Sequence, residues 1–162
     1  MKLHVPYFSE KITVTVCSDV VEVKAFQVIV WVSISGDETT TWDPRIPKLP
    51  AILDIGTTHN FAVTNDHLVN WAGIHAASLP QLGRARIDGR KAPLRSAGLW
   101  LHTNGEPFNF KIDEGIAVFD GDWPRLPILG LRALTNSKLQ TFIHGNTKQV
   151  LIRTPPKWYW PF

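Results

Sequence analysis

Short runs of β-branched and aromatic residues, separated by polar turns, dominate the hydrophobic pattern of this chain. Such side chains pack well on a pleated sheet, and a Gly-containing pair between two runs is typical of a hairpin. The pattern therefore predicts a mainly-β fold. The predicted strands cover residues 12–16, 20–23, 28–34, 51–53, 99–102, 108–112, 115–119, 127–130, 139–144 and 147–153.

Two segments carry the signals of short helices. Residues 64–73 begin with Thr64 and Asn65, either of which can cap a helix, and they end at Gly73, a residue that often follows a helix. Residues 131–138 form the second predicted helix.

Turn signals divide the rest of the chain. The Asp88-Gly89 pair predicts a hairpin over residues 86–91. Residues 39–50 contain three prolines and are expected to form an exposed connector, and residues 74–83 are expected to be irregular.

Residues 50–61 hold the most distinctive chemistry of the sequence. Apolar residues lead into Asp54, which is followed by Ile55 and Gly56. The apolar lead-in predicts a strand entering a core, and Gly56 marks a place where the backbone turns or lets another group approach closely. Because an ionised carboxylate is costly to bury unless it is paired or hydrogen-bonded, Asp54 is a functional candidate. The alternative is a turn aspartate that bonds its own backbone.

Composition limits the classes of protein that fit. The chain has 162 residues, which suits one domain, and its net charge of +3 is too small to require a nucleic-acid or membrane partner. The single cysteine, Cys17, excludes an internal disulfide and fits a reducing compartment. No secretory signal is visible, and the most apolar run, residues 28–32, is far shorter than the roughly 20 residues of a membrane-spanning helix. We therefore expect a cytoplasmic protein.

Rival chemistries find little support. His59, His67 and His75 are spaced by eight residues each, which matches no zinc motif, so we expect neither a metal nor a cofactor. Serine and cysteine hydrolysis lack their usual motifs. A stretch of basic residues forms either a solvated face or a surface that attracts acidic substrates, and the sequence leaves both alternatives open. Its residues are Arg84, Arg86, Arg90, Lys91 and Arg95.

The order of these elements resembles the retropepsin-like aspartic proteases, the single-lobed relatives of pepsin, over roughly residues 20–154. Residues 51–61 resemble the catalytic strand and turn of that family, in which apolar residues precede Asp-Thr/Ser-Gly. Residues 128–130, Ile-Leu-Gly before a helix, resemble its second signature. Residues 87–90 occupy the place of the flap, a hairpin that covers the active site.

The resemblance implies a single domain over residues 1–162, built as an acid-protease-like closed β-barrel with one or two short helices. A strand extension would precede its core, and the aromatic tail, residues 157–162, would follow it. That tail would belong either to the core or to a subunit interface.

The resemblance also implies an aspartic endopeptidase, in which two carboxylates that share one proton activate a water. Each chain supplies one such residue, Asp54, so the site would require a homodimer. A polypeptide substrate would lie extended under the flap, as an added strand. The residues implied in substrate binding are Gly56, Thr57, Ile87, Asp88, Gly89 and Ile128.

Ile55 departs from the family pattern. The Thr or Ser normally found there makes a hydrogen bond across the dimer axis, which an isoleucine cannot make. The alternative function is therefore a catalytically weak or inactive module of the same fold, which binds peptides or mediates assembly.

Overall fold

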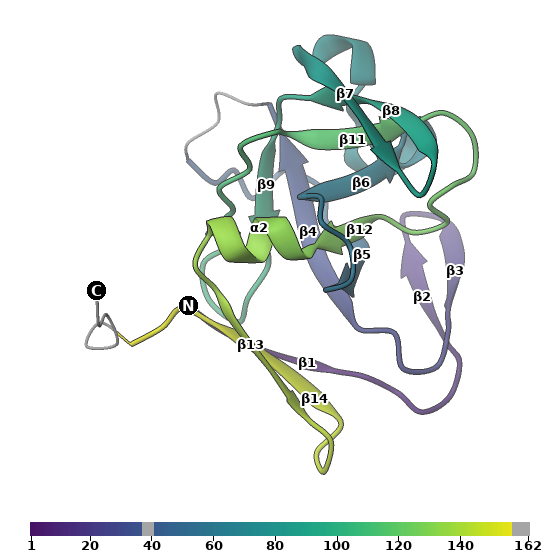
Figure 1. Ribbon diagram of the computed structural model, residues 1–162. Helices are drawn as coiled ribbons and strands as arrows, with labels where there is room; N and C mark the ends of the chain where they lie inside the picture. The colour runs from purple at the N-terminus through teal and green to yellow at the C-terminus, as the bar shows by residue number, and fades with distance from the viewer. Residues whose placement is uncertain (37–40, 157–162) are drawn as a thin grey trace.

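A nine-stranded sheet contains most of the strand residues in the computed structural model, which describes residues 1–36 and 41–156 (Figure 1). Its two ends pair strands that are consecutive in sequence, and its centre pairs strands that are distant in sequence. In spatial order they are β10 (Phe108–Asn109), β9 (Gly98–Leu101), β4 (Ile29–Ser35), β5 (Leu49–Asp54), β12 (Ile128–Gly130), β6 (Phe61–Thr64), β11 (Ile116–Phe119), β8 (Arg90–Arg95) and β7 (Gln81–Ile87).

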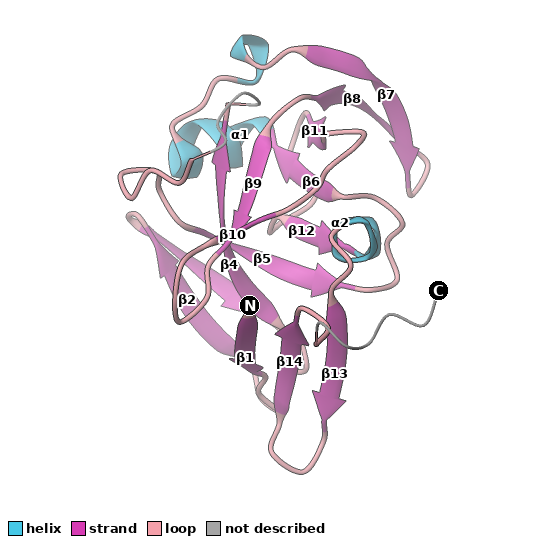
Figure 2. Cartoon of the chain, turned by 90° about the vertical axis from the view of Figure 1, so that its left-hand side faces the viewer, coloured by secondary structure: helices cyan, strands magenta, loops and turns pink. Residues whose placement is uncertain are grey.

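Two smaller sheets complete the described β-structure. One has the order β1 (Lys2–Pro6), β14 (Gln149–Arg153) and β13 (Gln140–His144), and Figure 2 shows these strands side by side next to the larger sheet. The other is a ribbon of β2 (Ile12–Val16) and β3 (Asp19–Val23). The expected N-terminal strand extension is β1, which pairs antiparallel with β14.

The mainly-β prediction is confirmed, with only short helices in the described part of the chain. None of the three sheets that the described strands form closes on itself: β10 and β7 are the two edges of the large one. The closed barrel therefore stays a prediction. The aromatic tail, residues 157–162, lies outside the described residues.

Both predicted helices are present but shorter than expected. The first consists of α1 (Asn65–His67) and a π-helical turn (Leu68–Ala72) that ends at Gly73 with φ 69°. Thr64 caps it, since its side chain accepts a hydrogen bond from the His67 backbone N–H at 3.1 Å. The second, α2 (Leu131–Asn136), stops two residues early.

Several strand boundaries differ from the prediction: β5, for example, begins at Leu49, inside the segment expected to be an exposed connector, and Leu49 and Pro50 are buried. Residues 81–83 were expected to be irregular, but β7 begins at Gln81 because this segment pairs with β8 despite its weak strand pattern. Residues 110–112 were expected to continue a strand, but β10 ends at Asn109. The Phe110 N–H still donates to the Leu99 carbonyl oxygen of β9 at 2.9 Å, but the Lys111 N–H donates to Ser137 Oγ beyond α2, also at 2.9 Å.

The insertion of β12 between β5 and β6 fixes the centre of the large sheet. β12 runs parallel to β5 and antiparallel to β6, and the turn that joins these two strands, residues 55–60, passes over the end of β12. The Gly130 N–H donates to Asn60 O and the Leu131 N–H donates to Thr57 O, both at 3.0 Å. Gly130 is required at this crossing, because a Cβ built on it would lie 2.0 Å from the carbonyl oxygen of His59.

We predict that Gly130→Ala lowers the free energy of unfolding by about 3 kcal/mol, because backbone atoms have to move to admit the methyl group. Gly145→Ala is the matched control, since a Cβ at Gly145 meets nothing within 4 Å. Its effect should stay within about 0.5 kcal/mol. Urea unfolding of both variants measures the difference, and equal midpoints for the two would contradict the crossing as the tight point of the fold.

Candidate active site at the end of β5

The register of β5 and β12 places Asp54 on a defined face of the sheet. Ile128 lies opposite Ile52, and Gly130 lies opposite Asp54. Because side chains alternate between the two faces of a strand, Asp54, Ile52 and Ile128 share one face, while Leu53 and Leu129 face the main core. Two of the site residues expected from the sequence, Asp54 and Ile128, are therefore brought to the same side.

The carboxylate of Asp54 is exposed in the isolated chain and is held by its own turn. Its Oδ1 accepts a hydrogen bond from the Gly56 N–H at 2.9 Å, and its backbone oxygen accepts one from the Thr57 N–H at 3.3 Å. The first bond is the one expected of a turn aspartate. Oδ2 makes no hydrogen bond with any described residue, so one carboxylate oxygen remains available for a further partner.

Polar side chains connect this turn and the neighbouring α2 to the segment before β11. The buried Asn60 donates through Nδ2 to Asp113 Oδ1 at 3.2 Å, and this bond holds the pKa of the Asp113 carboxyl below its usual value. Arg132, at the start of α2, forms an ion pair with Glu114. Burial, and next the charge of Arg132, lower the pKa of His59. The end of β5 is therefore attached to both α2 and the segment before β11.

The hairpin predicted over residues 86–91 is confirmed, and it covers the face that carries Ile128. Asp88 and Gly89 adopt φ values of 49° and 77°, as a two-residue hairpin turn requires. Ile87, just before this turn, is buried in a cluster with Phe119, and Ile128 packs against the same cluster. Three strands, β6, β11 and β8, lie between β12 and β7 in the order of the sheet. The sheet therefore has to curl for Ile87 to reach the cluster beside Ile128, and Figure 1 shows the hairpin turned back at the end of the sheet.

A cavity of about 290 Å³ lies beside this cluster. Ile52 and Ile128 line it together with Trp123, a residue that was not among the expected site residues. The Trp123 ring packs edge-on against Phe119, with ring centroids 4.8 Å apart, and the Arg90 guanidinium lies 5.1 Å from its centroid. The segment around Trp123 shows neither the strand nor the helix period of apolar residues. The only feature of the sequence that could have marked Trp123 as a site residue is that this aromatic residue precedes a proline.

Apolar side chains are exposed on the other side of Asp54. Ile55 is 53% exposed and Ile143 of β13 is 66% exposed. Together with Leu131 and Leu134 of α2 they line a hollow of about 320 Å³. Asp54 thus stands between two residues that line different concave surfaces, Ile52 and Ile55.

One of the three histidines considered as metal ligands, His67, has a structural role in this chain. His67 is buried, completes the cap of its helix with Thr64 and stacks on Trp71 with ring centroids 4.3 Å apart. Among residues 1–36 and 41–156, no group of three or more His, Cys, Asp or Glu side chains is arranged to hold a metal ion. No helix in the same ranges is long and apolar enough to cross a membrane.

The residues of the basic stretch differ in their contacts. Arg86 lies directly opposite Lys91, and both are exposed together with Arg84. Arg90 instead covers Trp123, and Arg95 donates to the Leu79 carbonyl oxygen at 3.1 Å. Only part of the stretch therefore forms a solvated basic face.

Comparison with known proteins adds no relative: no family model matches this sequence, and no curated protein matches it.

We predict that Ile87→Ala loosens the hairpin, because it removes the side chain that packs its tip onto the Phe119 cluster. The local opening free energy should fall by about 2 kcal/mol, which amide hydrogen exchange of β7 and β8 measures. Leu82→Ala is the matched control on the same strand, since Leu82 is half exposed and should change exchange by less than about 0.5 kcal/mol. Equal acceleration in both variants would count against the tip contact.

Proposed function

We propose that this chain is a retropepsin-like aspartic endopeptidase that hydrolyses peptide bonds as a homodimer. The observation that supports this most is the shared face of Asp54 and Ile128, which β12 creates by lying between β5 and β6 beneath the curled hairpin. The closed barrel of that family is not among the supports, because the large sheet of the described strands is open.

In the proposed mechanism two Asp54 carboxylates, one from each chain, lie close together at a twofold axis. Two negative charges at that distance are unfavourable, so the pair holds one proton and titrates as a unit. The ionised carboxylate takes a proton from the attacking water, and the protonated one donates to the oxygen of the scissile carbonyl. The free Oδ2 of Asp54 and the bond from Gly56 to Oδ1 suit this role, because the turn orients the carboxylate without using all of its acceptors.

The proposed substrate is an extended polypeptide that binds along this face between the Asp54 turn and the hairpin. Gly56 and Thr57 would contact its backbone, and Ile87, Asp88 and Gly89 would cover it from the hairpin tip. Ile128, with Ile52 and Trp123, would receive an apolar side chain in the cavity of about 290 Å³.

The homodimer is proposed on two grounds. A single described chain offers one Asp54 with an unpartnered oxygen, and the residues next to it are apolar and exposed. Burying Ile55 and Ile143 against a second copy would remove that apolar area from water. The free, exposed Cys17 supports a reducing compartment such as the cytoplasm.

The exposed Ile55 favours one alternative. Without a hydroxyl at this position the two turns lack a bond across the axis, so the chain could fold and dimerise weakly and yet cleave nothing. The alternative is a catalytically inactive module of the same fold, which binds peptides or mediates assembly.

An activity assay distinguishes the two functions. We predict that the chain cleaves unfolded protein between about pH 4 and 7, that a transition-state inhibitor of aspartic proteases blocks the cleavage, and that Asp54→Asn lowers the rate at least about a hundredfold. Asp66→Asn, which removes an exposed carboxylate in the first turn of α1, should keep the activity.

Two results would decide against the enzyme. Cleavage that survives Asp54→Asn would remove Asp54 from the mechanism. Absence of inhibitor-sensitive cleavage in the unmodified chain would favour the peptide-binding module.

A further inference from the structure

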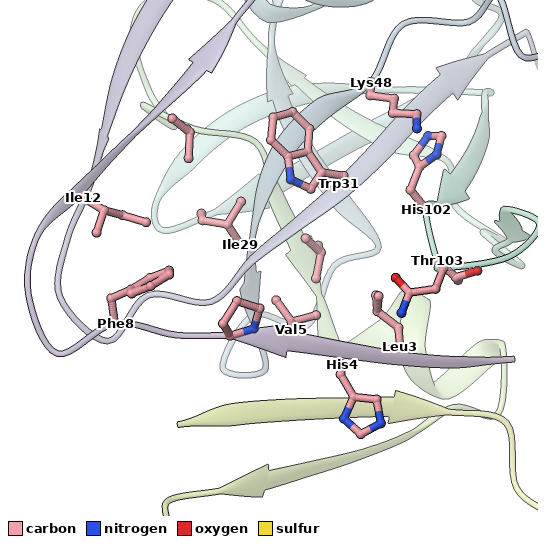
Figure 3. A pocket seen from close by; sticks show the side chains of 14 residues that line it. Leu3, His4, Val5, Phe8, Ile12, Ile29, Trp31, Lys48, His102 and Thr103 are labelled. Atoms are coloured by element: carbon pink, nitrogen blue, oxygen red, sulfur yellow. The ribbon is translucent and has the colours of Figure 1, made fainter. Parts of the chain in front are cut away.

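A second concave site lies on a different part of the molecule. Its cavity, of about 580 Å³, is bounded by β1, β2, the first residues of β4 and the segment after β9, and neither Asp54 nor any residue of the 86–91 hairpin lines it (Figure 3). Its apolar wall comes from segments that are distant in sequence. Its apolar lining includes Val5, Phe8, Ile12, Ile29 and Trp31.

This wall keeps large apolar side chains in contact with water. Phe8 is 46% exposed and Trp31 is 37% exposed, although both border a hollow with further apolar walls. Exposure of aromatic surface costs roughly 25 cal/mol per Å², so an apolar molecule that fills the cavity would gain this free energy. The volume falls in the range of about 300–1,000 Å³ that is usual for small-molecule sites.

One end of the cavity is polar and positively charged. Lys48 and His102 both line it, and Figure 3 shows the amino group of Lys48 directed toward the His102 ring. Lys48 forms no ion pair with any carboxylate in the described part of the chain. The site therefore offers a cation without a counter-charge beside an apolar wall.

The hydrogen bonds of His102 fix its state. Ser33 Oγ donates to the Pro47 carbonyl oxygen at 2.7 Å and lies 2.8 Å from His102 Nε2. Since the hydroxyl hydrogen is used for Pro47, this arrangement assigns the ring hydrogen to Nε2, which donates to Ser33. Burial, and next the charge of Lys48, lower the pKa of His102 to about 4. At neutral pH the imidazole is neutral, and Lys48 carries the charge of this end.

We propose that this cavity binds a monocarboxylate with a long apolar chain. Its carboxylate pairs with the Lys48 ammonium, and its chain lies along Ile29, Trp31 and Val5. A carboxylate fits because, among the described residues that line the polar end, Lys48 supplies a positive charge and none is an acid. An apolar chain fits because the remaining wall offers aliphatic and aromatic side chains. This site is independent of the proposed peptidase activity, and binding is measured without it.

The test uses the full chain and isothermal titration calorimetry at pH 7.5, with decanoate as the probe. We expect saturable binding of decanoate, weaker binding of 1-decanol, and none of butyrate. Lys48→Met should weaken decanoate binding about fivefold and leave 1-decanol unchanged, since an exposed ion pair contributes little more. Lys111→Met is the matched control, because this exposed lysine does not line the cavity.

A cavity-filling variant provides a second arm. Ile12 is half-buried on the β2–β3 ribbon, and Ile12→Trp should abolish the binding of both decanoate and 1-decanol while circular dichroism stays unchanged. If this variant does not fold, the selective loss in Lys48→Met decides.

Several outcomes would overturn the proposal. The first is the absence of saturable decanoate binding with a dissociation constant below about 1 mM, which is the weak limit of a specific site. The second is an equal loss of decanoate affinity in Lys48→Met and Lys111→Met. A third is decanoate binding that appears only after Trp158 and Trp160 are replaced by serine, which would assign the cavity to the chain's own aromatic tail.

Discussion

The passage of the 55–60 turn across the end of β12 is the constraint on which the rest of the structure depends. It works because Gly130 has no side chain at the point where the His59 carbonyl oxygen passes. Two backbone hydrogen bonds, from Gly130 to Asn60 and from Leu131 to Thr57, then join strand, turn and α2. With β12 held between β5 and β6, the register of Asp54 and Ile128 follows from backbone pairing alone.

The same crossing explains why the proposed chemistry is concentrated at this place. The turn presents Asp54 with one carboxylate oxygen bonded and the other free, and the curled hairpin covers the neighbouring face. On the other side of Asp54, the apolar side chains of Ile55 and Ile143 are exposed. A carboxylate flanked by a covered face on one side and an uncovered apolar surface on the other suits half of a shared site. Ile55 has two opposing effects on such a shared site. It adds apolar area to the uncovered surface, but it lacks the hydroxyl with which a Thr or Ser at this position would bond across the axis.

Local signals in the sequence were sufficient to predict most of the turns, caps and strands, but not to predict which segments pair or pack against each other. The Asp88-Gly89 turn, the Thr64 cap and the stop at Gly73 each depend on residues within one turn, and all three are present in the structure. The start of β7 at Gln81 was missed because only pairing with β8 makes that segment a strand. The contact of Trp123 with Phe119 and the cavity beside Trp31 could not be predicted, since each brings together segments whose spacing in sequence carries no period.

Mixing experiments test the central claim, that Asp54 is half of a catalytic centre completed by a second copy. Unmodified chain is equilibrated with increasing amounts of Asp54→Asn chain, and inhibitor-sensitive cleavage is measured per mole of unmodified chain. At a chain concentration where nearly all of the protein is dimeric, the account predicts that each mixed dimer is inactive, so that an equal mixture retains about half of that specific activity. Specific activity that stays constant at every mixing ratio would show that each chain carries a complete site, and it would contradict the account.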